Sequence, residues 1–191
     1  MMPLHTKRAF DLVLASILLV LFAVPMAVIA ILVRSTSRGP VLYWSRRVGR
    51  ENAPFSMPKF RTMRVGAPVV ATHLLTNPGR HITRIGRILR ATSIDELPQL
   101  FSIIEGHMSF VGPRPALCNQ DDLIALRTQQ GVHELTPGLT GWAQINGRDE
   151  LVIPKKVAYD AFYRTHQSFT FDLRILWRTC VVVFTRRGIQ H

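Results

Sequence analysis

The sequence RIGRILRATSIDELPQL, which runs from Arg84 to Leu100, is the stretch around which the rest of this chain is organised. Its first half repeats an arginine at every third position, at 84, 87 and 90. Residues three apart share one side of a helix, so this spacing predicts a helix with one cationic face. The apolar residues between them are turned elsewhere on this helix; they are Ile85, Ile88 and Leu89.

Two carboxylates follow, after a break that Thr92 and Ser93 predict. Ser93 and Glu96 have the spacing of a capping box, with Ser93 as the cap of a second helix. Pro98 argues against this register, because a proline past the first turn costs about 3 kcal/mol. If Asp95 is the cap instead, Pro98 falls at the third helical position and is tolerated. Either register places Asp95 at the positive end of a helix, which favours its charged form.

The neighbourhood of Asp95 and Glu96 has two interpretations. Acidic residues in the first turn of a helix are ordinary capping residues, and beside three arginines they can form a plain ion-pair patch. The same residues can instead form an anion site that contains a nucleophile or a metal ligand. The rest of the chain decides between these interpretations.

Charge and hydropathy together narrow the function classes. The chain has 191 residues, which suits one domain with a real core, and its formal net charge is +12. Such a charge suits nucleic acid, an anionic membrane surface or a phosphate-rich substrate. Because 47% of the residues are also hydrophobic, the combination favours a membrane enzyme that handles phosphates. Cys118 and Cys180 are far apart, which predicts reduced thiols, and the histidines lack the spacing of a zinc site.

An uncharged segment of 22 residues extends from Leu12 to Val33, and about 20 residues suffice to cross a bilayer as a helix. The segment is too long for the apolar part of a signal peptide. Pro25 lies near its middle and removes a backbone hydrogen bond, which favours a kink. Cations flank both ends, so the positive-inside rule gives no orientation. The pattern fits both a spanning helix and a helix that bends at Pro25 and leaves by the face it entered.

A small β-hairpin is predicted next. Two short strands are expected at residues 41–44 and 55–63, joined by a polar turn at 49–52. The second strand alternates cations, including Lys59 and Arg61, with apolar residues. This alternation suits a strand with one basic face, and it equally suits a solvated edge strand.

The second half of the chain alternates loops and helices. Loops are expected at residues 65–79 and in the glycine-rich stretch 136–148, where backbone N–H groups could approach a ligand closely. Arg114 lies between two prolines that hold its backbone extended. The guanidinium of Arg114 is therefore carried by a rigid segment of backbone. A helix is expected at residues 117–130, and another begins at Pro154.

The final stretch, residues 169–187, has arginines on either side of a Trp- and Val-rich segment. This arrangement is typical of a helix that lies in a membrane interface. A buried core helix fits the same pattern equally well.

Five ordered motifs resemble those of the bacterial sugar transferases, the monotopic polyprenyl-phosphate phosphoglycosyl transferases. They begin at Lys7, Lys59, Ser93, Gly112 and Pro137 and read KRxFD, KFRTM, SIDELPQ, GPRP and PGLTGWAQINGR. The resemblance covers nearly the whole chain. It is to the small form of the family, the catalytic core without additional N-terminal spanning helices.

This resemblance implies the transfer of a phosphosugar from a UDP-sugar to undecaprenyl phosphate, with UMP as the second product. Asp95 matches the family's nucleophile, which forms a covalent phosphosugar intermediate, and Glu96 matches the second acid of the dyad. Mg²⁺ is the implied cofactor, with Asp95 as its ligand. Pro25 matches the break of the family's re-entrant membrane helix, although Val24 stands where the family often has a serine.

Several cations are candidates for the substrate site. Transfer between two anions requires that several negative charges be neutralised in one place, which cations and Mg²⁺ can do. Arg90 and Arg114 suit bidentate binding of phosphate, and Lys59 is expected to join them. Three further candidates have no assigned role, namely Arg61, Arg148 and Asp172, of which Asp172 lies where the family carries an acid before its terminal helix.

The predicted fold is α+β and mostly helical. Residues 1–35 are expected to form a re-entrant membrane helix. Residues 36–191 are expected to form a catalytic domain, with a small β-hairpin and amphipathic interfacial helices, on the cytoplasmic face of the bacterial inner membrane. The implied reaction is the first membrane step of glycoconjugate assembly, for O-antigen, capsule, exopolysaccharide or glycoprotein.

The expected partners are a UDP-sugar, a polyprenyl phosphate and inner-membrane lipid, and a homo-oligomer is compatible with the sequence. Two alternatives stay open. A membrane-anchored nucleic-acid-binding protein is suggested by the charge alone, but the chain lacks a binding motif or an aromatic stacking pattern, so no nucleic acid is expected. A non-catalytic membrane scaffold is the other alternative, and the intact dyad argues against it.

Overall fold

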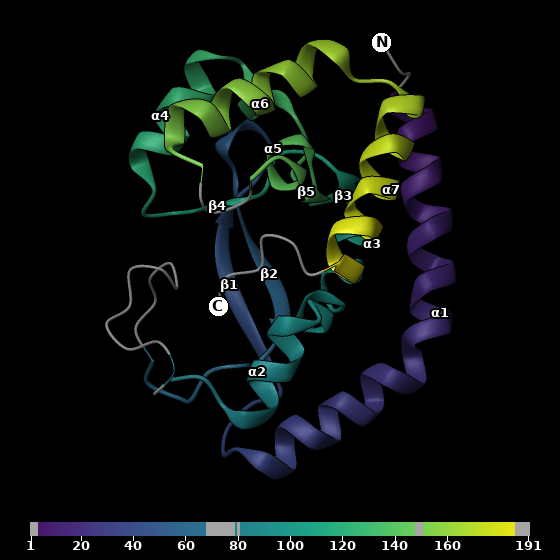
Figure 1. Cartoon of the computed structure of the whole chain (residues 1–191), viewed down its shortest axis with the longest axis vertical. Helices are drawn as coiled ribbons and strands as arrows, with labels where there is room; N and C mark the ends of the chain where they lie inside the picture. The colour runs from purple at the N-terminus through teal and green to yellow at the C-terminus, as the bar shows by residue number, and fades with distance from the viewer. Residues whose placement is uncertain (1–3, 68–78, 80, 148–150, 186–191) are drawn as a thin grey trace.

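The computed structural model describes residues 4–67, 79, 81–147 and 151–185 of the chain (Figure 1). Helices form most of this part, and a three-stranded and a two-stranded sheet complete it. The predicted α+β class with mostly helical content is therefore confirmed. Most of the predicted loop at 65–79, and Arg148 with it, lies outside the described residues.

Helix α1 (Leu4–Thr36) is an α-helix of 33 residues with Pro25 in its interior. It is long and apolar enough to cross a membrane by length and composition, and its mean hydropathy reaches 3.0. Large apolar side chains along it are exposed, among them Val20 at 80% and Val24 at 73%. Leaving such a side chain in water instead of burying it costs about 1.5–3 kcal/mol. These side chains therefore suit a lipid environment.

Figure 1 shows α1 as two arms that meet at a bend. The first arm packs through Leu14 and Ala15 on a core cluster that includes residues of α3 (Gln99–Glu105). The second arm packs through Ile29 and Val33 on another cluster that includes residues of α2 (Arg84–Ala91). Pro25 lies between the two packed groups, where its missing N–H allows a helix to bend. Both arms therefore pack against the rest of the protein.

Strands β1 (Leu42–Val48) and β2 (Pro54–Phe60) form the predicted antiparallel hairpin, with Leu42 opposite Phe60 and Val48 opposite Pro54. β1 extends past the predicted end at residue 44, because strand β4 (Ala116–Leu117) pairs with its last two residues and satisfies their backbone groups. β2 ends before the predicted residue 63, where only an isolated bridge is formed.

The glycine-rich stretch is more regular than predicted. It contains strand β5 (Gly138–Thr140), which pairs in parallel with β3 (Ser109–Val111), and the short helix α5 (Trp142–Ile145). A Cβ atom at Gly138 would lie 2.1 Å from the backbone nitrogen of Gly112, and one at Gly141 would lie 2.1 Å from the Gly112 carbonyl oxygen. These glycines therefore serve the close approach of two backbone segments rather than the approach of a ligand.

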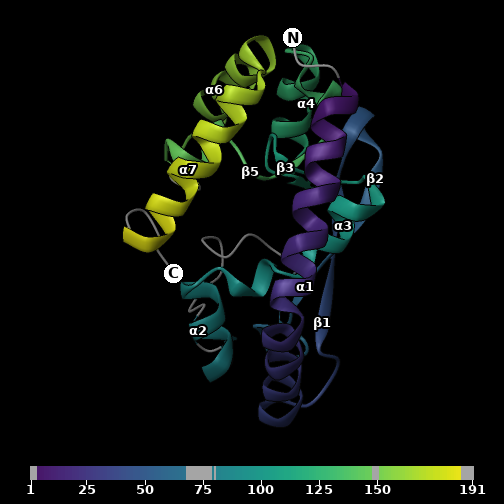
Figure 2. The same cartoon turned by 90° about the vertical axis from the view of Figure 1, so that its right-hand side faces the viewer.

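Three longer helices complete the fold: α4 (Asp121–Gln129), α6 (Ile153–His166) and α7 (Phe169–Thr185). Figure 2 shows α6 and α7 on one side of the molecule and β2 with α3 on the other. α4 begins later than the predicted residue 117, because Leu117 belongs to β4 and donates its N–H to Oε1 of Gln120 at 2.8 Å. The helix predicted after Pro154 is confirmed as α6, and the one predicted at 169–187 is confirmed as α7 up to Thr185, the last described residue.

Helix α7 has two different apolar faces. Ile175 is fully buried in the main core, and Asp172 is buried one turn before it. On another face, four large apolar side chains spaced by four residues are exposed by 39–70%: Phe169, Leu173, Trp177 and Val181. The two predicted interpretations of this stretch therefore hold for different faces of one helix, since one face packs in the core and the other suits a membrane interface.

Candidate active site

Asp95 lies in a short turn between two helices, not at the start of an α-helix. Residues Ile94–Glu96 form a single 3₁₀ turn, and α3 begins only at Gln99 with Pro98 as its N-cap residue. Ser93 adopts a left-handed conformation, with φ of 57°, and its side chain makes no capping hydrogen bond within the described residues. Ser93 is thus the N-cap residue of this 3₁₀ turn, as in the first predicted register, but without the side-chain bond of a capping box, and the register with Asp95 as the cap is wrong. Pro98 explains this, because it has no N–H to donate and is placed just before the helix that follows.

Helix α2 confirms the helix predicted from the arginine spacing. Its N-cap is Thr83, whose Oγ1 accepts a hydrogen bond from Gly86 N at 2.9 Å. Gly86 and Leu89 face the core, and Arg84 and Arg87 are exposed. The third arginine, Arg90, is half-buried and close enough to lower the pKa of Asp95. One member of the cationic face is therefore directed toward the carboxylates.

Glu96 is held by the arginine between the two prolines. Nη2 of Arg114 donates to Oε1 of Glu96 at 2.7 Å. Burial raises the pKa of Glu96, but the charge and hydrogen bond of Arg114 outweigh this effect, with Lys59 and Arg47 adding to them, and hold the pKa below its ordinary value. Glu96 is therefore an ionised carboxylate at neutral pH, oriented by one guanidinium.

Asp95 has a different environment from its neighbour. Its side chain is buried, with 7% of the residue exposed, and no hydrogen bond to its carboxylate is formed by the residues that the structure describes. Burial, and after it the charge of Glu96, raise the pKa of Asp95 to about 6 against the opposing charges of Lys59, Arg90 and Arg114. Two adjacent carboxylates whose pKa values are moved in opposite directions are suited to different roles.

Lys59 joins this group from β2. It is half-buried with its Nζ 5.7 Å from the centre of the Tyr43 ring. Burial lowers the pKa of Lys59, while the charges of Asp95 and Glu96 raise it, so the two acids lie near the ammonium group. The three cations proposed as phosphate ligands, Lys59, Arg90 and Arg114, thus gather around the dyad.

Arg47 is a member of the cluster that the sequence analysis missed. Its charge contributes to the lowered pKa of both Glu96 and Lys59. Its guanidinium donates to Oγ of the buried Ser45 at 2.9 Å and to the Pro115 carbonyl at 3.2 Å. The alternation along a strand places Ser45 and Arg47 on one face, but this signal was lost because the predicted strand ended at residue 44.

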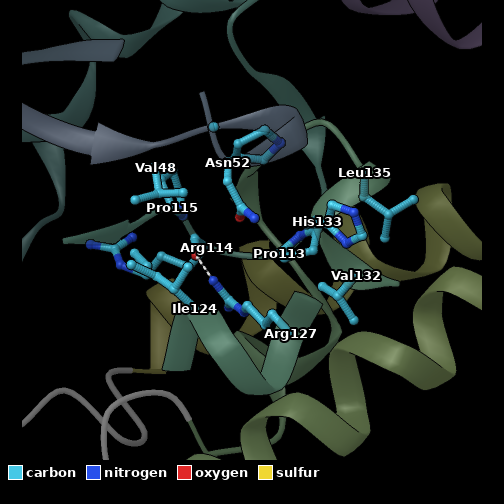
Figure 3. A pocket seen from close by; sticks show the side chains of 13 residues that line it. Val48, Asn52, Pro113, Arg114, Pro115, Ile124, Arg127, Val132, His133 and Leu135 are labelled. Atoms are coloured by element: carbon cyan, nitrogen blue, oxygen red, sulfur yellow. Dashed lines mark hydrogen bonds between the residues drawn. The ribbon is translucent and has the colours of Figure 1, made fainter. Parts of the chain in front are cut away.

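A small cavity adjoins the site. It measures about 30 Å³, and the Pro113–Pro115 segment, Arg127 and His133 are among the residues that line it (Figure 3). This volume holds about two water molecules, since one needs roughly 10–15 Å³. A nucleotide sugar is far larger, so the cavity is not a substrate site.

Comparison with known proteins identifies the family. The model described as bacterial sugar transferase matches residues 2–186 of this chain. The chain belongs to the bacterial sugar transferase family. The matched range includes all five motifs, so the family resemblance is confirmed, and the nucleic-acid-binding alternative loses its support.

The transferase is similar over nearly its whole length to several known proteins. It is 41% identical to the uncharacterized sugar transferase EpsL of Bacillus subtilis, over 97% of this chain and 90% of that protein. It is 37% identical to the exopolysaccharide production protein ExoY of Rhizobium meliloti, over 95% and 87%. It is also 37% identical to the UDP-glucose:undecaprenyl-phosphate glucose-1-phosphate transferase of Escherichia coli, over 95% of this chain but 41% of that protein. The transferase thus spans less than half of the E. coli enzyme.

Arg61, one of the three candidates without an assigned role, has structural partners. Arg61 is buried and donates to the carbonyl groups of Arg38 and Ser37, at 2.7 and 2.8 Å, and to Oγ of Ser37 at 2.7 Å. It thereby fixes the chain that leaves α1. Arg148 lies outside the described residues.

Asp172 joins three elements of the transferase away from the dyad. It forms a buried ion pair with Lys7 of α1 and accepts a hydrogen bond from the Tyr163 hydroxyl of α6 at 2.6 Å. Arg8, the next residue of the same motif, donates to the carbonyl groups of Ile103 and Ile104 at the end of α3. The KRxFD motif therefore anchors α1 to α3, α6 and α7.

Proposed function

We propose that this transferase moves a phosphosugar from a UDP-sugar to a polyprenyl phosphate, such as undecaprenyl phosphate, and releases UMP. The name of the E. coli relative supports both substrate classes. The product is a polyprenyl-diphosphate sugar, which places the reaction at the first membrane step of glycoconjugate assembly.

The dyad is the observation that carries the proposal. Asp95 is buried among three cations and has a pKa raised to about 6, and it accepts no hydrogen bond within the described residues, so its oxygens are available to a reacting group. Glu96 instead is engaged by Arg114. A carboxylate in a positively charged, partly dry environment can attack an anionic phosphate without prohibitive repulsion.

The reaction then proceeds in two displacements at one phosphorus atom. An oxygen of Asp95 attacks the phosphorus that carries the sugar, the bond to the bridging oxygen breaks, and UMP leaves with the electron pair. An oxygen of the polyprenyl phosphate next attacks the same phosphorus, and the bond to Asp95 breaks. The carboxylate is regenerated, so one difficult transfer becomes two simpler ones. Lys59, Arg90 and Arg114 neutralise the phosphate charges throughout.

Mg²⁺ fits this site as the cofactor. Among the described residues, no cluster of three or more His, Cys, Asp or Glu side chains could hold a metal alone. Mg²⁺ is commonly bound through one or two carboxylates together with substrate phosphates and water, and Asp95 offers such a carboxylate. When bound, Mg²⁺ would supply charge neutralisation at the phosphates.

The orientation in the membrane is part of the proposal. The start of α1 is tied to the catalytic domain by Lys7 and Asp172, and the chain after its end is tied by Ser37 and Arg61. A spanning helix would separate these ends by the hydrocarbon core of a bilayer, about 30 Å thick. These contacts support a re-entrant helix at residues 1–35, with both ends on one side of the membrane. We propose that this side, which carries residues 36–191, is the cytoplasmic face of the inner membrane.

The proposed function is tested with a panel of UDP-sugars and undecaprenyl phosphate. We expect UMP release and a lipid-linked diphosphate sugar with at least one of them, dependent on Mg²⁺ and on the lipid phosphate for multiple turnovers. Release of UMP without any lipid-linked product would contradict the proposed acceptor. Absence of UMP release with every UDP-sugar would contradict the proposed donor class.

The topology is tested by cysteine labelling in intact cells. In a background with Cys118 and Cys180 replaced by serine, we expect His5→Cys and Ser35→Cys both to resist a membrane-impermeant thiol reagent until the inner membrane is permeabilised. His5 and Ser35 are exposed, so shielding by the fold does not explain protection. Labelling of either position from the periplasm would show that α1 spans the membrane.

A further inference from the structure

We propose that the buried ion pair between Arg127 and Asp160 is a positioning device for Arg114. This inference rests on the proposed function, in which Arg114 binds phosphate and holds Glu96. Neither member of the pair stood out in the sequence, since they lie 33 positions apart on α4 and α6.

The Pro113–Pro115 segment is held by three different elements. Each of its three carbonyl groups accepts one hydrogen bond, and the donors in order are Gly138 N at 2.9 Å, Arg127 Nη1 at 2.8 Å and Arg47 Nη1 at 3.2 Å. Figure 3 shows the bond from Arg127 to the Arg114 carbonyl as the link between α4 and this segment. The backbone that carries the Arg114 guanidinium is therefore fixed from several sides.

The bond from Arg127 has a specific role in this arrangement. The peptide group between Arg114 and Pro115 has no N–H, because its nitrogen belongs to proline. The carbonyl oxygen of Arg114 is thus the group of this peptide unit that can form a hydrogen bond, and Arg127 donates to it. The neighbouring proline restricts the Arg114 backbone to an extended conformation, but it supplies no such contact.

Arg127 is itself held by Asp160. Its Nε and Nη2 donate to Oδ2 of Asp160 at 3.0 and 2.7 Å, and the side chains are only 9% and 2% exposed. Burial raises the pKa of Asp160, and the charge and hydrogen bonds of Arg127 oppose this. A buried pair of this kind is weak as a stability device, because desolvation offsets much of the attraction. A role in fixing one geometry accounts better for its presence.

A small cavity beside the segment gives this bond a further role. It measures about 30 Å³, and Pro113–Pro115, Arg127 and His133 are among the residues that line it. Without the Arg127 bond, the segment has room to shift toward the cavity and move the guanidinium away from Glu96. A misplacement of about 1 Å in a catalytic site can cost on the order of 100-fold in rate.

The test is a double-mutant cycle. Arg127→Lys keeps the charge opposite Asp160 but loses the fork that reaches both Asp160 and the Arg114 carbonyl. With Arg114 present, we expect kcat for UMP release to fall about 10- to 100-fold, with a smaller change in the KM for the UDP-sugar. In an Arg114→Ala background, the same substitution should change kcat by less than about twofold, because the group that it positions is gone.

Arg164→Lys is the matched control, since Arg164 of α6 pairs with Glu134 on the surface, and we expect it to leave kcat unchanged. Equal losses from Arg127→Lys in both Arg114 backgrounds would overturn the proposal and leave the pair a merely structural contact. Normal kcat in Arg127→Lys would overturn it as well. If Arg127→Lys fails to fold, Asp160→Asn, which keeps the amide oxygen as an acceptor, takes its place in the cycle with the same expected non-additivity.

A second double-mutant cycle, of Arg127→Lys with Glu96→Gln, is measured by thermal unfolding and needs no activity. Because Arg127 holds Arg114 on Glu96, the Tm losses of Arg127→Lys and Glu96→Gln should be less than additive. Additive losses would overturn the proposal. A wild-type protein that releases no UMP from any UDP-sugar would contradict only the proposed function, and the unfolding cycle would still decide the role of the pair.

Discussion

Asp95→Asn is expected to abolish the release of UMP, both in a single turnover and at steady state, while the protein still folds and binds membranes. An amide has nearly the volume and shape of the carboxylate, but it is a poor nucleophile and a poor ligand for Mg²⁺. Removal of the nucleophile in a covalent mechanism costs on the order of 10⁴- to 10⁶-fold in kcat. Turnover and the burst are measured with a UDP-sugar, with and without undecaprenyl phosphate.

Two further variants, one on the surface and one at the neighbouring acid, are compared with Asp95→Asn. Asp122→Asn removes an exposed carboxylate of α4 and should have no effect, which controls for the loss of one negative charge. Glu96→Gln should be impaired but keep part of the burst, because Glu96 orients Arg114 and does not itself attack. A burst of normal size in Asp95→Asn would show that another residue is the nucleophile.

Arg114→Lys is expected to lower kcat about 10- to 100-fold. The substitution keeps the charge but loses the planar fork, and each charge-assisted hydrogen bond is worth about 1.5–3 kcal/mol. In the structure, one Nη of Arg114 is already engaged with Glu96 at 2.7 Å, so a single ammonium cannot hold Glu96 and a phosphate with the same geometry. The measurement is steady-state release of UMP at saturating UDP-sugar.

Arg46→Lys is the control for this substitution, since Arg46 is exposed on β1 and is expected to tolerate it. Near-normal kcat in Arg114→Lys would show that the guanidinium has only a structural role. Such a result would also remove the basis for the positioning role of Arg127.

The local signals in the sequence predicted much of the site. The spacing of three arginines predicted α2, and the motifs brought Lys59, Arg90 and Arg114 together as candidate phosphate ligands, as the structure does. The hairpin was predicted because alternation and turn residues are local properties. Pro25 predicted a bend, and the structure places it between two separately packed arms of α1.

The differences from the prediction have a local cause and a long-range cause. The capping box is not formed at Ser93, because this residue adopts a left-handed conformation that the local pattern does not indicate. Arg61 was a candidate without an assigned role, and its partners are carbonyl groups of the chain after α1, 23 and 24 positions away. Asp172 pairs with Lys7, 165 positions away, and this long-range pairing leaves no trace in either local sequence.

The central claim is that Asp95 forms a covalent bond to the phosphosugar. Mass spectrometry of the protein quenched after mixing with Mg²⁺ and a UDP-sugar alone tests it most directly. We expect a phosphosugar adduct on the peptide that contains Asp95, together with close to one UMP released per active site, and loss of the adduct when undecaprenyl phosphate is added. An adduct on another residue, or release of UMP only when both substrates are present together, would contradict the mechanism.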